Sequence, residues 1–187
     1  MIHLTIRALP TSIIVMCFAV LWPGFVMARE ANGSAMMVSS SASAPKPKAS
    51  AVLVDKSNRS LRLLNDGKTL REYSISLGKK PVGHKLYEGD QRTPEGRYIL
   101  DWRNSNSKFY RSLHVSYPNS RDAARARKLG KSPGGNIMIH GLPNEFHYAP
   151  WLYKGKDWTD GCIAVNNTEM DEIWEMVDDG TPIIILP

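Results

Sequence analysis

The sequence of 187 residues predicts one mainly β domain with a few short helices. Three observations support this: eight short apolar runs lie between turn-forming residues, one tetrapeptide has a hairpin composition, and only two segments have helical character. The composition is 42% apolar and 22% charged, which excludes a wholly disordered chain. The two cysteines, Cys17 and Cys162, exclude a disulfide-dense scaffold and a four-cysteine zinc site.

Residues 1–28 have the features of a secretory signal peptide. Arg7 gives a positive start, residues 13–21 form an apolar run too short for a comfortable membrane span, and Ala28 offers a small residue for cleavage. An uncleaved anchor is the alternative, and the bulky residue before Cys17 disfavours a lipid anchor there. We therefore expect an exported protein of the periplasm or cell envelope, with no stable membrane span after cleavage.

Residues 29–50 are rich in Ser and Ala and contain two prolines near their end. Such a stretch buries too little apolar surface to offset the entropy of ordering it, so we expect a flexible tether. An arm that becomes ordered on a partner is the alternative. Residues 51–187 are then the folded domain.

The first three strands of that domain are expected to form a meander. Residues 51–55 are a compact apolar run, residues 60–64 alternate in part, and residues 70–76 follow a turn. That turn is Asn65-Asp66-Gly67-Lys68, whose Asp-Gly pair suits a two-residue hairpin. Further apolar runs predict strands at residues 96–102, 112–116, 137–140, 162–165 and 182–186.

Two helices are expected between these strands. Residues 121–129 are rich in Ala and Arg and end at a glycine, and their basic side chains form a solvated face. Residues 168–177 begin at Thr168, the expected cap, with Asp171 at the third helical position. The apolar face of this helix follows the spacing i, i+3, i+4 and i+7, as Met170, Ile173, Trp174 and Val177.

The most informative residues are His140 and Cys162, 22 positions apart. If the signal segment is removed, Cys162 is the only cysteine left, and an unpaired exported thiol is either a buried small hydrophobe or a nucleophile. A strand that ends at His140 presents an imidazole at a sheet edge, and Gly161 lets the backbone before the cysteine approach a substrate. On spacing alone, a catalytic pair and two unrelated structural residues both remain open.

Residues 51–187 resemble the L,D-transpeptidases of bacterial cell walls, the YkuD-type catalytic domain. The resemblance depends on the meander, on the segment from Asp90 to Tyr98 with its Thr-Pro-x-Gly motif, on His140-Gly141 and on Thr159-Asp160-Gly161-Cys162. It implies an L,D-transpeptidase-type β-sandwich or barrel-like arrangement of mixed sheets with two or three short helices. The segment Ser116-Tyr117-Pro118-Asn119 resembles the branch that contains murein endopeptidase and amidase relatives.

The resemblance also implies roles for individual residues. Cys162 is the nucleophile, His140 is the general base and acid, and the Gly141 carbonyl orients His140. The N–H groups of Gly161 and Cys162 stabilise the oxyanion. No metal or cofactor is expected. The expected substrate-binding residues are Asp160, Thr159, Trp158, His114 and Tyr117.

Several of these residues have a second interpretation. Asp160 can instead shape its turn, and His114 can be a solvated surface histidine. Trp158 lies in an aromatic loop that forms either a lid over the substrate or a local hydrophobic cluster. Many family members have His in place of Asp160 and Arg in place of Ala164, and the loop before Cys162 is longer here.

The implied activity is that of a cell-wall L,D-transpeptidase, which transfers an acyl group of a peptidoglycan stem peptide through a thioester. The product is a cross-link or a protein attached to peptidoglycan, so stem peptides and a wall-linked lipoprotein are the expected partners. The alternatives are a hydrolase on the same scaffold (L,D-carboxypeptidase, endopeptidase or amidase) and an inactive peptidoglycan-binding module. The net charge of +6 suits a polyanionic partner, and export argues against nucleic acid.

Overall fold

The computed structural model describes residues 46–153 and 155–187. The expected signal segment and most of the expected tether lie outside these residues. In the described part, no helix is long and apolar enough to cross a membrane. The elements, in chain order, are β1 (Ala51–Asp55), β2 (Ser60–Asn65), β3 (Lys68–Ser74), β4 (Gly96–Ser107), β5 (Tyr110–Val115), α1 (Ser120–Lys128), β6 (Met138–His140), η1 (Asn144–Phe146), η2 (Pro150–Leu152), β7 (Ile163–Ala164), α2 (Asn167–Met176) and β8 (Thr181–Leu186).

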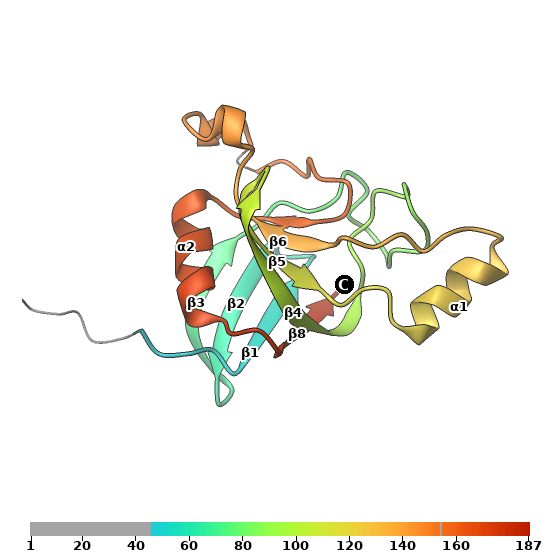
Figure 1. Ribbon diagram of the computed structural model, residues 1–187, viewed down its shortest axis with the longest axis horizontal. Coiled ribbons are helices and arrows are strands. Elements are labelled where there is room, and N and C mark those ends of the chain that lie inside the picture. Colours follow the sequence, from blue (N-terminus) through green and yellow to red (C-terminus); the bar gives the residue numbers. More distant parts are fainter. Residues whose placement is uncertain (1–45, 154) are drawn as a thin grey trace, which may run out of the picture. The chain divides into compact units, whose positions relative to one another are not determined.

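The described strands form one mixed sheet in the order β3-β2-β1-β8-β4-β5-β6-β7. The pairs β1–β8 and β6–β7 are parallel and the other pairs are antiparallel. Figure 1 shows the sheet curling on itself, with α2 along one side and α1 projecting from the other. The mainly β, mixed-sheet fold is therefore confirmed.

The predicted hairpin between β2 and β3 is present. Asp66 and Gly67 have φ angles of 48° and 77°, as a tight two-residue turn requires. The strand β4 is longer than predicted, because it continues to Ser107 through polar residues that pair with β5. The alternation of apolar and polar residues does not reveal such an extension, because the backbone hydrogen bonds between two hairpin strands need no apolar side chains.

The predicted start of the second helix is wrong. Asn166, not Thr168, caps α2: its side chain accepts a hydrogen bond from the Glu169 N–H, and the Glu169 carboxylate accepts one from the Asn166 N–H. This reciprocal capping box satisfies two N–H groups at once, which Thr168 with Asp171 does not achieve. The expected apolar face is confirmed, with Met170 and Ile173 buried.

The core lies between the curled sheet and α2, and it contains buried side chains of β1, β2, β5, β8 and the helix. The residues just before β1 also contact α2. The Ala49 N–H donates to the Met176 carbonyl at 2.7 Å, and Lys48 pairs with Asp178 at 2.6 Å. The expected boundary between tether and domain stays a prediction, but the residues next to it are held against the helix.

Candidate active site

The neighbouring parallel strands β6 and β7 place His140 and Cys162 in diagonal positions. His140 is the last residue of β6, Cys162 directly precedes β7, and the parallel register pairs Ile139 with Ile163 and His140 with Ala164. Ile139 and Ile163 point into the core, so strand alternation places His140 and Cys162 on the other face. Strand spacing and rise put their α-carbons roughly 8 Å apart, within reach of the two side chains.

The His140 ring is fixed by one hydrogen bond and two aromatic neighbours. Its Nδ1 lies 2.7 Å from the Gly141 carbonyl oxygen. A carbonyl only accepts, so Nδ1 carries the proton and Nε2 keeps a free lone pair in the neutral ring. Ring centroids of Phe109 and Trp158 lie 4.6 and 5.6 Å away. The side chain is 3% exposed, and this burial lowers the pKa of His140 to about 4, so the ring is neutral at pH 7.

The Gly141 carbonyl is itself held in place by its surroundings. The Gly141 N–H donates to the Phe109 carbonyl at 3.1 Å, and the next N–H, of Leu142, donates to Asn167 Oδ1 at 2.9 Å. A Cβ on Gly141 would lie 2.6 Å from the same Asn167 oxygen, so no side chain fits there. The start of α2 and the β4–β5 hairpin thus fix the group that orients His140.

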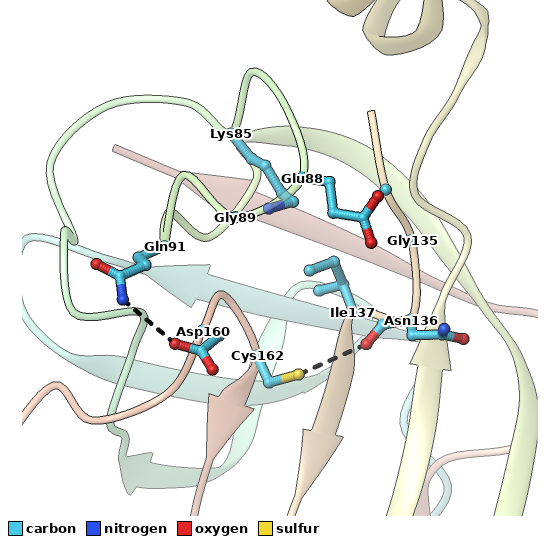
Figure 2. Close-up of a pocket in the computed structure, with 10 residues that line it drawn as sticks. Lys85, Glu88, Gly89, Gln91, Gly135, Asn136, Ile137, Asp160 and Cys162 are labelled. Carbon is cyan, nitrogen blue, oxygen red and sulfur yellow. Dashed lines mark hydrogen bonds between the residues drawn. The ribbon is translucent and has the colours of Figure 1, made fainter. Parts of the chain in front are cut away.

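The Cys162 thiol lies in a pocket and points toward the neighbouring backbone. It donates to the Asn136 carbonyl at 3.6 Å, as Figure 2 shows. Burial raises the pKa of the Cys162 thiol above its ordinary value. With His140 also neutral, the resting pair is a thiol and an imidazole rather than a thiolate and an imidazolium.

Thr159 and Gly161 shape the turn that presents the cysteine. The Thr159 hydroxyl donates to the Cys162 carbonyl at 2.8 Å and accepts from the Gly161 N–H at 3.1 Å. Gly161 has a φ of 131°, and a Cβ there would lie 2.7 Å from the Arg92 carbonyl oxygen. Backbone packing therefore requires the glycine, and the approach of a substrate to it stays a prediction.

This turn also decides which N–H groups are free. The Gly161 N–H, one of the two expected oxyanion donors, donates to the Thr159 hydroxyl. For the Cys162 N–H, no acceptor is present among residues 46–153 and 155–187. Of the two expected donors, the Cys162 N–H is thus the one left without an acceptor in the described part of the chain.

The thiol pocket has a volume of about 400 Å³ and lies between residues 85–91 and residues 134–137. Lys85, a buried residue of its wall, pairs with buried Asp90 at 2.9 Å. Asp160 lines the same pocket and pairs with exposed Lys79 at 3.0 Å. Figure 2 shows Lys85 and Asp160 together with Cys162 among the residues that line the pocket. No sequence pattern had indicated Lys85, because an isolated lysine in a loop carries no sign of its burial.

Of the five expected substrate-binding residues, Asp160 lines this pocket, and Thr159, Trp158, His114 and Tyr117 do not. His114 pairs with Asp101 at 2.6 Å and stacks on Trp102 at a centroid distance of 4.8 Å. Tyr117 is buried and donates its hydroxyl proton to the Pro133 carbonyl at 3.1 Å, so it supports the pocket wall from beneath.

Trp158 packs between His140 and the loop before it, and it lines a second pocket. Both Trp158 and Phe109 shield the histidine, but no sequence pattern had indicated Phe109. Within the described residues, no group of three or more His, Cys, Asp or Glu side chains is arranged to hold a metal ion.

The curled mixed sheet, with a histidine and a Gly-Cys pair at neighbouring strand ends, defines an enzyme domain of the L,D-transpeptidase class. More particularly, the chain belongs to the family described as YkuD, L,D-transpeptidase catalytic domain, which matches residues 49–185. Proteins of this family act on the stem peptides of peptidoglycan.

Individual relatives agree with this assignment. The chain is 28% identical over 145 residues to the Bacillus subtilis (strain 168) protein named "Putative L,D-transpeptidase YqjB", covering 75% of this chain and 73% of that protein. It is similar to the helical cell shape determining protein Pgp2 of Campylobacter jejuni, with 29% identity and a TM-score of 0.56 over 72% of this chain and 46% of Pgp2. Bd1075 of Bdellovibrio bacteriovorus gives 27% identity and a TM-score of 0.51, over 73% of this chain and 47% of that one. The chain thus spans about half the length of these two solved relatives.

Proposed function

We propose that this protein is an exported cysteine acyltransferase that uses Cys162 and His140 to cut and rejoin stem peptides of the cell wall. The observation that supports this best is the neutral His140, whose Nδ1 proton is committed to Gly141 and whose Nε2 is free to accept a proton. A neutral thiol, half-buried in its pocket, and a fixed neutral base suit proton transfer during attack. The family match and the cell-shape relatives point to the cell wall as substrate.

The first half of the reaction removes a terminal residue. Rotation of the Cys162 side chain away from Asn136 brings the thiol toward His140, which takes its proton as sulfur attacks the carbonyl between a diaminopimelate-type L-centre and a D-amino acid. The Cys162 N–H stabilises the oxyanion, a contact worth about 3 kcal/mol of barrier in other enzymes. The C–N bond then breaks, and His140 returns the proton to the departing amine.

The second half resolves the thioester. An amine of another stem peptide or of a wall-linked protein attacks the carbonyl, His140 takes its proton, and the thiol is restored with that proton. When water enters instead, the product is a shortened stem peptide. Asp160, exposed on the pocket wall, exchanges its partner Lys79 for the incoming ammonium group before that group loses its proton.

The test is incubation of the purified protein with labelled muropeptides. We expect new dimers, no turnover by Cys162→Ala, and a carbapenem adduct on the wild-type protein at Cys162. Shortened monomers without dimers would mean that the protein is a hydrolase on the same scaffold and not a transferase. Correctly folded wild-type protein that forms no adduct and turns over no muropeptide would be a wall-binding module, and the proposal would be wrong.

A further inference from the structure

A second pocket, of about 630 Å³, lies beside the thiol pocket and is larger than it. It is bounded by the turn between β1 and β2, the end of β3, the start of α2 and the loop that contains η2. Figure 1 shows this loop as the short coiled segment that stands above α2. The segment from Asp157 to Cys162 separates the two pockets, since Asp157 lines one and Cys162 the other.

One wall of this second pocket is aromatic. Trp151, Tyr153 and Trp158 all line it, and all come from one stretch of eight residues. Trp151 is 67% exposed, although it is among the largest apolar side chains of the domain. Tyr153 and Trp158 lie with their ring centroids 4.8 Å apart. An exposed tryptophan on a concave surface provides a flat face for a ligand that has apolar C–H groups.

The charged groups of this pocket are already paired within the protein. Arg59 donates from Nε and Nη2 to the Asp157 carboxylate, at 3.1 and 2.7 Å, and that carboxylate also accepts the Leu77 N–H at 3.0 Å. Glu169 accepts the Asn166 N–H at 3.0 Å as part of the α2 cap. Among the described residues, Arg59 is the cation that lines this pocket, and it is already paired, so these residues favour an uncharged ligand over an anionic one.

The remaining polar groups are hydroxyls, amides and an indole N–H. Ser74 and Ser76 line the side formed by β3, and the Ser76 hydroxyl makes only a 3.5 Å contact to the Tyr153 carbonyl. The Trp158 Nε1 is buried and has no hydrogen-bond partner among the described residues. Aromatic faces opposite neutral donors and acceptors match a sugar ring, which has apolar C–H faces and a rim of hydroxyl and amide groups.

We propose that this second pocket binds an uncharged N-acetylated sugar unit of the glycan strand that carries the stem peptide. This inference rests on the proposed function for its biological substrate. The lactyl carboxyl of such a strand is used up in the bond to the peptide, so the sugar next to a stem peptide is neutral. Three extended residues span roughly 10 Å. Ala164, which lines the sugar pocket, has its α-carbon roughly 7 Å from that of Cys162, so one stem peptide can join the two sites.

Two features link the sugar pocket to the reaction. Trp158 lines the pocket and also contacts the His140 ring, so a bound sugar steadies a neighbour of the base. Ala164 stands where many family members have an arginine, and an arginine there would project its long side chain into this space. The small side chain is therefore part of what keeps the pocket open.

The test compares two substrates and two variants. The substrates are a free tetrapeptide and the same peptide on its disaccharide, and the variants are Trp151→Ala and, as control, Trp102→Ala, an exposed tryptophan outside both pockets. We expect wild type to prefer the disaccharide peptide, and Trp151→Ala to lower kcat/KM about tenfold for that substrate alone. Trp102→Ala is expected to behave as wild type.

Binding of tri-N-acetylchitotriose, followed by NMR, separates this inference from the proposed function. Saturable binding that is lost in Trp151→Ala supports the sugar site even if neither peptide is turned over. Equal kcat/KM for both substrates in wild type, with no chitotriose binding, overturns the sugar site and leaves the acyltransferase proposal intact.

Discussion

Buried His140 should make the folded protein lose stability as the pH falls. Its pKa is about 4 in the folded protein and about 6.5 in an unfolded chain, so between these values the unfolded chain binds the extra proton. Stability from this residue is complete above about pH 6.5 and is lost as the pH falls toward 4. The full effect is about 3 kcal/mol, most of which is lost between pH 7.5 and pH 4.5.

The assay is urea unfolding at several pH values between 7.5 and 4.5, on wild type and His140→Gln. Glutamine does not titrate, so the variant should show a shallower fall in unfolding free energy over this range, whatever its stability at pH 7.5. His147→Gln is the matched control, because His147 is an exposed histidine. The same pH dependence in wild type and His140→Gln would refute the burial argument, and with it the neutral base of the mechanism.

Three further predictions concern the turn around the cysteine. Because burial raises the pKa of the Cys162 thiol, its alkylation by iodoacetamide should keep accelerating with pH beyond 9; a fast rate independent of pH between 5 and 8 would mean a stable thiolate instead. Gly161→Ala should lower the free energy of unfolding by about 2–4 kcal/mol, because the new Cβ meets the Arg92 carbonyl and the residue has a positive φ. Gly155→Ala is the control: its Cβ meets no atom within 4 Å, so it should cost about 1 kcal/mol in the same urea titration. Thr159→Val should lower the free energy of unfolding by about 1–3 kcal/mol and slow acylation of Cys162, measured by mass spectrometry. Thr159→Ser keeps both hydrogen bonds and should lose less. Equal losses in the two variants would contradict the role of the hydroxyl.

Local chemistry allowed much of the fold to be predicted. The Asp66-Gly67 turn was predictable because few residue pairs tolerate two positive φ angles. The apolar face of α2 was also predictable, because burial repeats with the period of the helix. The N-cap of that helix was not predictable. Asn166 and Thr168 are both residue types that cap helices, and the path of the chain between β7 and α2 decides which of them is the cap.

The candidate site also has a part that the sequence predicts and a part that it does not. The motifs of the sequence determined which cysteine, histidine and glycines to consider, because these residue types at these positions carry the family resemblance. Their physical state was decided by residues far away in the chain: Phe109 buries His140, Asn136 receives the thiol, and the Arg92 carbonyl leaves no room beside Gly161. Burial and close approach arise only when distant segments meet, so the neutral charge of the pair and the separate sugar pocket required the tertiary structure.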